Sequence, residues 1–310
     1  MHATRGTKIR TAVAGVLTIV LTGCVAPGSG GGGGGGGQTP TTTTTPSESC
    51  PTPTETATVT NPNGGAGLYV DVSRPSTAAT GDLPVVVMVP GGRSDSTLFT
   101  CGADVAQQIA DADYVVVTFD PDGRGNSTGT EDNGGTRQQD GLAAVFEFAL
   151  TLDGVDAGRA ALVTNSFGVT MASGAMVNHP DLPVDLLVDW EGPADRNDTG
   201  GCDGSGSGGH LRGNDCTDES FWEQREAATF VAQLDVPYVR VQSETDHVQP
   251  DTDHALTMVN AAFTGGVPLV QLNDFVVTEE LTAIPDGVLL DDSYDHRTAE
   301  VFVGHLEALL

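Results

Sequence analysis

Apolar segments with strand character alternate along the chain with segments of helical spacing. Residues 67–75 alternate between apolar and polar side chains, which is typical of an early antiparallel strand. Later apolar runs predict buried strands over residues 83–92, 114–120, 160–165, 184–190, 236–243 and 267–273. Helices are predicted within 96–111, over 138–152, after Ser166, from His254 and over 298–310, and residues 286–290 are compatible with one more strand. This order predicts an α/β fold with a mostly parallel sheet covered on both faces. Functional loops would lie at the carboxyl ends of its strands.

The first 23 residues have the pattern of an export signal. Arg5, Lys8 and Arg10 precede a short apolar run that ends near Leu21, and the run is too short to span a bilayer comfortably. The sequence Leu-Thr-Gly-Cys at 21–24 resembles the lipobox of prokaryotic lipoproteins, which implies cleavage before Cys24 and lipidation of that cysteine. The alternative is an ordinary secretory signal followed by an incidental cysteine.

Residues 24–66 have the composition of a tether. Eight consecutive glycines at 30–37 precede a Thr/Pro-rich tract that cannot bury a core. We therefore expect a flexible tether over 24–66 and one folded domain over 67–310.

The charge balance is strongly acidic. Without the three basic residues of the signal, ten arginines and no lysine face 42 acidic residues, which gives a net charge of −32. Nucleic acid is therefore an unsuitable partner. The near-absence of lysine resembles proteins adapted to high salt, and the alternative is an acidic surface that only aids solubility.

Four cysteines follow Cys24. An even number in an oxidising compartment predicts two disulfides. We favour Cys202 with Cys216, which closes a short glycine-rich loop, and Cys50 with Cys101, which would join the tether to the domain. Free thiols are the alternative.

Candidate chemistry centres on Ser166, where a predicted strand meets a predicted helix. The sequence Asn-Ser-Phe-Gly at 165–168 contains most of a G-x-S-x-G turn, with Thr164 in place of the first glycine. With the order of elements, it resembles the α/β-hydrolase superfamily, and most closely its esterase and dienelactone-hydrolase-like group. The resemblance extends over nearly all of 67–310. The alternative for Ser166 is a structural serine in a degenerate homologue.

This resemblance implies a catalytic triad in the order serine, acid, histidine. Asp246, in the loop after the strand that ends near Ser243, takes the position of the acid, with Asp189 and Glu191 as reserve candidates. His296, just before the last helix, takes the position of the base. The other histidines beyond the acid loop fit less well, because His247 directly follows the acid and because His254 and His305 lie in helical patterns.

Two further segments resemble parts of the same family. Residues 89–96 resemble the loop that supplies the first oxyanion donor, which implies the amides of Gly92 and Phe167 as donors, although a simple turn is the alternative. Residues 120–129 resemble the family's D-x-R-G loop, in which Arg124 is structural.

A glycine-rich insertion over about 192–226 occupies the cap position, and its composition argues against a large helical lid. Its side chains Asp195, Asn197, Asp198 and Asp203 are possible calcium ligands, but a solvated, disulfide-pinned loop is the favoured interpretation.

Together these features predict an exported, lipid-anchored serine hydrolase of the cell envelope. It would cleave a small-molecule carboxylic ester through an acyl-enzyme, with no cofactor and no catalytic metal. Its expected contacts are the ester substrate and the membrane, the latter through the N-terminal lipid. The alternatives are a peptidase or amidase on the same fold and a non-catalytic binding protein.

Overall fold

The computed structural model describes residues 50, 51, 53, 55–199, 216–249, 251–291 and 298–310. All of them belong to one compact unit, Ser47–Leu310. Cys24, Cys202 and His296 lie outside the described residues. Within the described ranges, no helix has the length and apolarity needed to cross a membrane.

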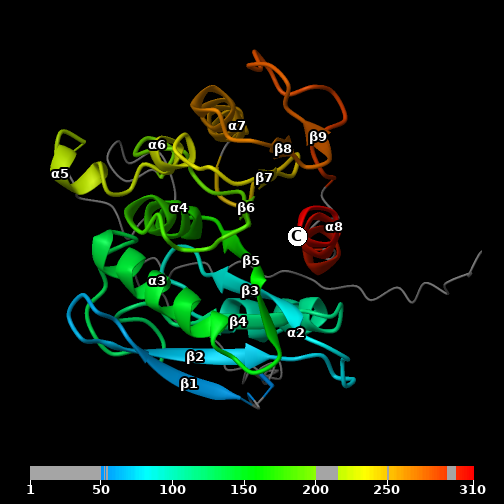
Figure 1. Cartoon of the computed structure of the whole chain (residues 1–310). Coiled ribbons are helices and arrows are strands. Elements are labelled where there is room, and N and C mark those ends of the chain that lie inside the picture. The colour runs from blue at the N-terminus through cyan, green and yellow to red at the C-terminus, as the bar shows by residue number, and fades with distance from the viewer. Residues whose placement is uncertain (1–49, 52, 54, 200–215, 250, 292–297) are drawn as a thin grey trace, which may run out of the picture. The chain divides into compact units, whose positions relative to one another are not determined.

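One sheet of nine strands runs through the described part of the chain (Figure 1). Its order is β1-β2-β4-β3-β5-β6-β7-β8-β9, with parallel pairing from β4 through β8. The strands are β1 (Thr56–Thr60), β2 (Gly67–Ser73), β3 (Leu83–Val89), β4 (Val115–Phe119), β5 (Val155–Asn165), β6 (Leu186–Trp190), β7 (Tyr238–Val241), β8 (Val270–Leu272) and β9 (Phe275–Val276). This is the mostly parallel sheet predicted from the sequence.

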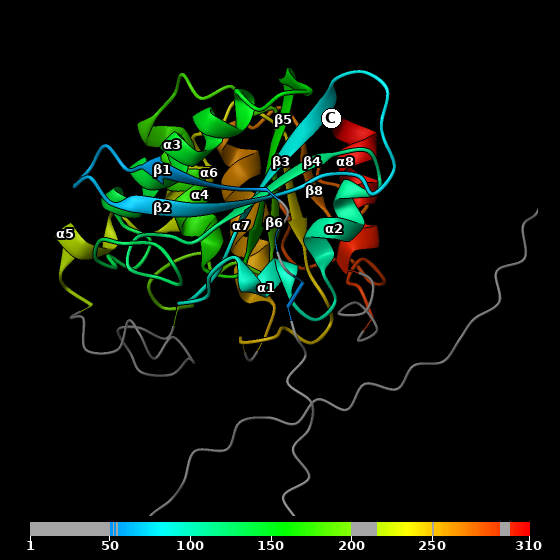
Figure 2. The same cartoon turned by 90° about the horizontal axis from the view of Figure 1, so that it is seen from below.

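Helices cover both faces of the sheet (Figures 1 and 2). The helices are α1 (Thr97–Thr100), α2 (Val105–Ala110), α3 (Thr136–Leu150), α4 (Gly168–Asn178), α5 (Glu219–Trp222), α6 (Ala227–Val231), α7 (Asp253–Gly265) and α8 (Thr298–Leu309). Apolar residues of α3, α4, α6 and α7 pack in one core cluster, whereas those of α1, α2 and α8 pack in a second. Because the central strands contribute to both clusters, β3, β4 and the second half of β5 are mostly apolar.

The predicted tether ends earlier than we expected. Residues Thr56–Thr60 form β1 and pair with β2 in antiparallel register, from Thr56 opposite Asp71 to Thr60 opposite Gly67. Alternate residues of β1 are half-buried, with Ala57 and Val59 packed against the core. The segment could be mistaken for low-complexity chain because threonine, which favours strands, is also abundant in the preceding tract.

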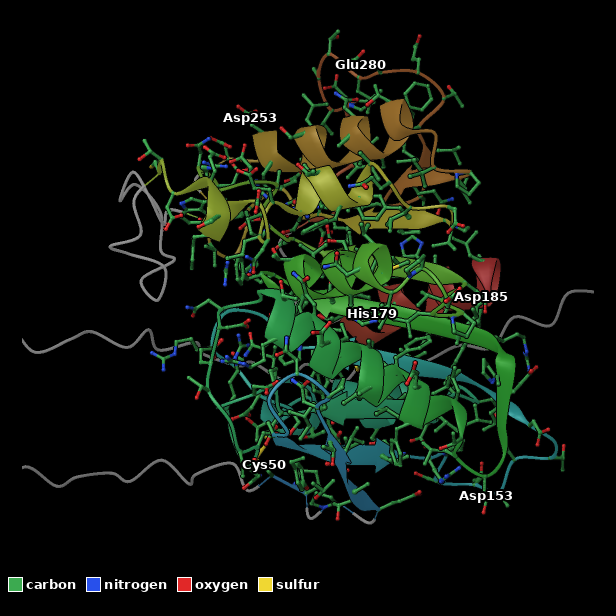
Figure 3. The ribbon with its side chains drawn as sticks, turned by 60° about the vertical axis from the view of Figure 1, so that its left-hand side comes forward. Cys50, Asp153, His179, Asp185, Asp253 and Glu280 are labelled. Carbon is green, nitrogen blue, oxygen red and sulfur yellow. A yellow bond between two sulfur atoms is a disulfide. The ribbon has the colours of Figure 1, made fainter. Side chains whose placement is uncertain are left out.

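The chain before β1 is fixed by a disulfide between Cys50 and Cys101, as predicted. Cys50 lies beside the edge of the sheet where β1 and β2 run (Figure 3). Cys216 is also disulfide-bonded, while its predicted partner Cys202 lies outside the described residues.

The segment after β8 differs in detail from the prediction. A tight turn at Asn273, whose φ is 50°, leads into β9, which pairs antiparallel with β8. Residues 286–290 form no strand, although Leu290 makes an isolated bridge with Ser243. This bridge ties the segment to the end of β7.

Candidate active site

Ser166 occupies a sharp turn between β5 and α4. Its φ is 50°, in the left-handed region that is unfavourable for a residue with a side chain. Its amide donates a 2.7 Å hydrogen bond to the carbonyl of Trp190 at the end of β6. The residue is half-buried, and its hydroxyl makes no hydrogen bond with any residue in the described part of the chain. Such a strained strand-to-helix turn holds a serine hydroxyl at the carboxyl edge of the sheet.

Three glycines make room for this turn. A Cβ on Gly91 would clash with the Asn165 carbonyl and the Ser166 side chain, and one on Gly168 would clash with the Val89 carbonyl. A Cβ on Gly192 would collide with Val169, Asp189 and the carbonyl of Ser166. The absence of side chains at these glycines therefore lets the backbone of neighbouring segments pack closely against the turn at Ser166.

Thr164, the departure from the G-x-S-x-G pattern, is accommodated within β5. Its side chain is fully buried, and its hydroxyl lies 3.4 Å from Asp189 Oδ1 on the adjacent strand β6. β-branched residues suit strand geometry. The substitution therefore leaves the turn at Ser166 intact.

The loop after β3 faces the same turn. Gly91 and Ser94 close a tight turn through a 2.9 Å bond from the Ser94 amide to the Gly91 carbonyl, and Gly92 within it has a φ of 50°. The loop is fixed at its far end because Asp120 Oδ1 accepts bonds from the amide and hydroxyl of Ser96, at 2.9 and 2.6 Å. Phe167, the second predicted oxyanion donor, directly follows Ser166 and precedes α4. Both predicted donors thus belong to the segments that meet at Ser166.

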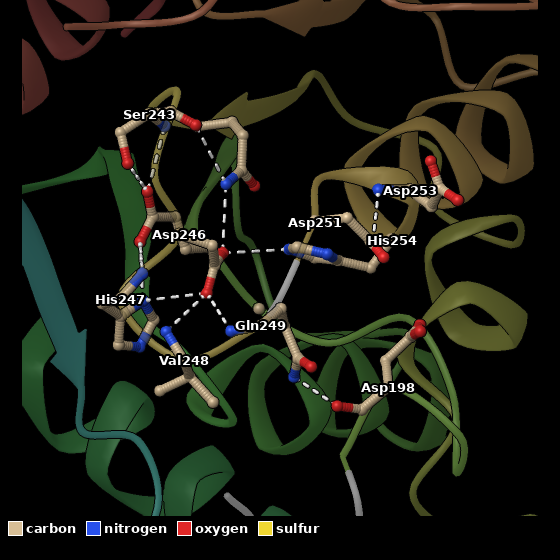
Figure 4. Close-up of polar contacts among 12 residues, drawn as sticks. Asp198, Ser243, Asp246, His247, Val248, Gln249, Asp251, Asp253 and His254 are labelled. Carbon is tan, nitrogen blue, oxygen red and sulfur yellow. Dashed lines mark hydrogen bonds and ion pairs between the residues drawn. The ribbon is translucent and has the colours of Figure 1, made fainter. Parts of the chain in front are cut away.

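Asp246, the predicted acid, lies in a dense network after β7 (Figure 4). Its side chain is fully buried. One carboxylate oxygen accepts the amides of Val248 and Gln249, each at 2.7 Å. The other accepts Gln242 Nε2 at 3.0 Å and lies 3.1 Å from His254 Nε2. Burial opposes ionisation, but these hydrogen bonds outweigh it and lower the pKa of Asp246.

Glu191, a reserve candidate for the acid, holds the same loop from the end of β6. One carboxylate oxygen accepts the amide and hydroxyl of Ser243, and the other accepts the amide of His247 and lies 2.6 Å from His247 Nδ1. Burial opposes its charge, yet the bonds from His247 and Ser243 lower its pKa. Conversely, burial alone would lower the pKa of His247, but the bond to Glu191 raises it.

The histidines of this region differ in exposure. The His247 side chain is 29% exposed and its ring lies 5.9 Å from that of Trp190, so one edge of the imidazole remains accessible beside the strand that supports Ser166. His254 is buried against Asp246, and His305 is buried in α8. The predicted base His296 lies outside the described residues. The structure thus brings Asp246 together with Glu191, His247 and His254.

Asp189, the other reserve candidate for the acid, forms a buried ion pair that joins two strands. Its carboxylate is fully buried, and one oxygen lies 2.7 Å from both Arg240 Nη1 and the Tyr238 hydroxyl. The other oxygen accepts the amide of Gly192 at 3.1 Å. This ion pair joins β6 to β7 beneath the acid loop.

Glu191, Asp246 and His247 are the described residues whose grouping would suit a metal ion, with ligand atoms within 4.8 Å of one another. Each carboxylate oxygen already accepts two hydrogen bonds within the protein. The group is therefore satisfied as a hydrogen-bonded network.

The described ends of the insertion are ordered by their own polar contacts. Arg196 forms ion pairs with Glu219 at 2.8 Å and Glu226 at 2.5 Å. The Asp195 and Asp198 carboxylates accept amides of their own turn, at Asn197 and Ala194. Asp203 lies outside the described residues. Elsewhere, Arg124 is buried in an ion pair with Glu131 at 2.6 Å, in keeping with the structural role predicted for it.

Two contributors were missed from the sequence. Gln242 and His254 complete the hydrogen bonds of Asp246, and the available signal for His254 was a histidine among the buried positions of an amphipathic helix. Nothing in the sequence indicated that His247 contacts Glu191. In addition, the adjacent side chains of Asp246 and His247 were expected to point apart, but His247 Nδ1 lies 3.6 Å from Asp246 Oδ1.

No protein-family model matches the sequence, and no curated protein matches it either. Solved structures do match. Dipeptidyl peptidase 4 from Porphyromonas gingivalis is 16% identical with a TM-score of 0.63, and the match covers 83% of this chain and 35% of that one. An esterase from Pyrococcus furiosus is 12% identical with a TM-score of 0.56, covering 82% of this chain and 90% of that one.

A Klebsiella pneumoniae structure described as a dienelactone hydrolase is 13% identical with a TM-score of 0.52, and the match covers 82% of this chain and 97% of that one. The chain thus spans about a third of the peptidase but nearly the full length of the two smaller enzymes. The likeness, together with the strand order and the turn at Ser166, shows that this chain has the α/β-hydrolase fold.

Proposed function

We propose that this protein is a serine hydrolase that cleaves a carboxylic ester through an acyl-enzyme intermediate. The observation that carries the proposal is the left-handed backbone of Ser166 at the end of β5, with α4 beginning directly after it. A strained serine directly between a strand and a helix is the arrangement in which a nucleophilic hydroxyl is presented to a substrate.

In this proposal His296 removes the proton from Ser166 while the hydroxyl oxygen attacks the ester carbonyl. Asp246 orients the imidazole and stabilises its charged form, and for this role His296 must displace one of the four donors that occupy the Asp246 carboxylate, of which His254 at 3.1 Å is the longest contact. The amides of Gly92 and Phe167 donate to the oxyanion, where each donor typically contributes about 3 kcal/mol. The protonated imidazole then gives its proton to the leaving alcohol, and water hydrolyses the acyl-enzyme by the same steps.

Ester cleavage is the activity proposed and peptide cleavage is the alternative, because enzymes of both kinds are among the matched structures. The esterase and the dienelactone hydrolase are matched over 90% and 97% of their lengths, and the peptidase over 35%. The non-catalytic alternative would keep this strained serine turn without using its hydroxyl.

The proposal includes export and anchoring by a lipid on Cys24. The Cys50–Cys101 disulfide is compatible with an oxidising compartment. Replacing Cys24 by serine should release the protein from membranes into the soluble fraction, and membrane retention of that variant would contradict the anchor.

The test of activity is hydrolysis of p-nitrophenyl esters of several acyl lengths by the purified protein. Ser166→Ala should lower kcat/KM by roughly 10⁴-fold or more. Thr80→Ala, which removes an exposed hydroxyl on the loop between β2 and β3, is the matched control and should leave the rate unchanged. Equal rates for Ser166→Ala and wild type would refute the proposal.

A further inference from the structure

Asp71 is a buried carboxylate far from the candidate active site in sequence. It lies in β2 and is 6% exposed. The apolar residues Leu68, Val70 and Val72 point into the core cluster shared with α3. Because side chains alternate along a strand, Asp71 points to the opposite face.

Asp71 has no ion-pair partner among the described residues. The nearby Arg74 guanidinium is occupied by Glu55, at 2.6 Å, and by the carbonyl of Asp153. The backbone amide of Val72 favours the charged form of Asp71, but that amide already donates to the Glu55 carbonyl. Burial, and after it the negative charges of Asp104 and Asp120, raise the pKa of Asp71 to about 6. A buried carboxylate in such surroundings is costly unless a cation compensates it.

A second polar group beside Asp71 also lacks a partner. Thr118 of β4 is the cross-strand partner of Asp71, so the two side chains share one face of the sheet. Thr118 is 1% exposed, and its hydroxyl makes no hydrogen bond within the described part of the chain. Buried hydroxyls are almost always bonded, so the Thr118 hydroxyl is a second unsatisfied oxygen on the face of the sheet that carries Asp71.

Asp71 lines a cavity of about 290 Å³ between β2, the end of α1 and the start of α2. Oxygen-bearing side chains dominate its lining, namely Asp71, Ser73, Ser76, Thr100, Asp104 and Gln107. Pro51 and Pro53, next to the Cys50–Cys101 disulfide, form another wall. The volume holds a cation with several water molecules.

We propose that this cavity binds a calcium ion, with the carboxylates of Asp71 and Asp104 as its charged ligands. Calcium takes six to eight oxygen ligands in irregular geometry, which hydroxyl, amide and water oxygens of this cavity would complete. The ion would neutralise the repulsion between the two carboxylates. It would also join β2 to the segment that carries Cys101, just after the loop that holds Gly92.

The test is thermal unfolding of the full chain in EDTA and in calcium, both in 1 M NaCl so that general screening of the acidic surface is already complete. Saturating calcium should raise the Tm of the wild type by roughly 5 °C. Asp71→Asn and Asp104→Asn should abolish this shift. Asp82→Asn, which removes one exposed carboxylate elsewhere, is the matched control and should keep it.

The sign of the Tm difference between Asp71→Asn and the wild type in EDTA distinguishes a calcium ligand from a carboxylate with only a structural role. Asp71→Asn should melt higher than the wild type in EDTA, because it removes an uncompensated buried charge, and lose that advantage in calcium. Titration calorimetry should show that Asp71→Asn binds about one calcium ion fewer than the wild type. Any calcium bound by the insertion over about 192–226 would be the same in both proteins. An equal calcium shift in wild type and Asp71→Asn, no shift in the wild type, or a lower Tm of Asp71→Asn in EDTA would each overturn the proposal.

Discussion

Ser166 and Glu191 both adopt left-handed backbone conformations, with φ of 50° and 51°, on adjacent turns. Each such conformation costs about 1–3 kcal/mol and persists only where surrounding contacts determine it. Here the Ser166 amide bonds to Trp190, the Glu191 amide bonds to Val241, and the Glu191 carboxylate holds Ser243 and His247. The turn that carries the proposed nucleophile and the loop that carries the proposed acid are therefore supported by one short segment at the end of β6.

We predict a pH-dependent loss of stability for Glu191→Gln. Because the pKa of Glu191 is lowered in the folded state, its charge contributes fully to the free energy of unfolding above pH 4.5. This stabilisation is lost as the pH falls through the pKa of the folded state. Because the pKa of His247 is raised in the folded state, its charge contributes fully to the free energy of unfolding below pH 6.5. This stabilisation is lost as the pH rises through the pKa of the folded state. Urea unfolding should therefore show the largest difference from wild type between pH 4.5 and 6.5, and a smaller one at alkaline pH.

The control for this variant is Glu244→Gln, which changes an exposed carboxylate on the same loop. It should unfold like the wild type at every pH. A stability difference for Glu191→Gln that stays constant from pH 5 to 9 would contradict the coupling of these two side chains.

Residues with a local signature could be predicted from the sequence, and those defined by distant contacts could not. Ser166 and Asp246 follow strands that their apolar runs reveal, so their places at the carboxyl edge were predictable. The contact of Glu191 with His247 joins residues 56 positions apart, and the contact of Asp246 with His254 depends on where α7 begins. Such contacts depend on tertiary packing, which one sequence does not specify position by position.

Helices and strands with a clear local pattern could also be predicted from the sequence, and those without one could not. Strands β3 to β7 were predicted because burial on both faces requires long apolar runs, and α3 and α8 because one apolar stripe repeats at helical spacing. β1 was missed because an edge strand with one half-buried face carries a weak pattern. β9 has two residues and is defined by its turn at Asn273, so it has no periodicity of its own.

The disulfide beside β1 gives a prediction about these elements. Cys50 and Cys101 are 51 positions apart. On a loop-entropy model the bridge stabilises the fold by about 4 kcal/mol. Replacing both cysteines by serine should lower the free energy of unfolding by that order in urea titrations at pH 7. A double variant that unfolds at the wild-type midpoint would show that β1 and its neighbours are held by other contacts alone.

At the scale of the whole molecule, the dominant property is charge. Ten arginines face 42 acidic residues after the signal, and the described arginines of the ion pairs are already committed to individual carboxylates. The remaining acidic groups repel one another across the surface, and this repulsion opposes the compact state.

Salt should therefore stabilise the protein. Ions at molar concentration shorten the screening length to about 3 Å and remove most of this repulsion. We predict a Tm in 2 M NaCl well above that in 20 mM NaCl, measured in EDTA so that the calcium site does not contribute. A flat or falling Tm across this range would argue against adaptation to salt.

The central claim is that Ser166 is a nucleophile served by His296. The most direct measurement is labelling of the folded protein with a fluorophosphonate probe, followed by peptide mapping. We predict label on Ser166 that is lost in His296→Ala and retained in His247→Ala. Label on another residue of the active protein, or loss of label in His247→Ala with retention in His296→Ala, would contradict this assignment.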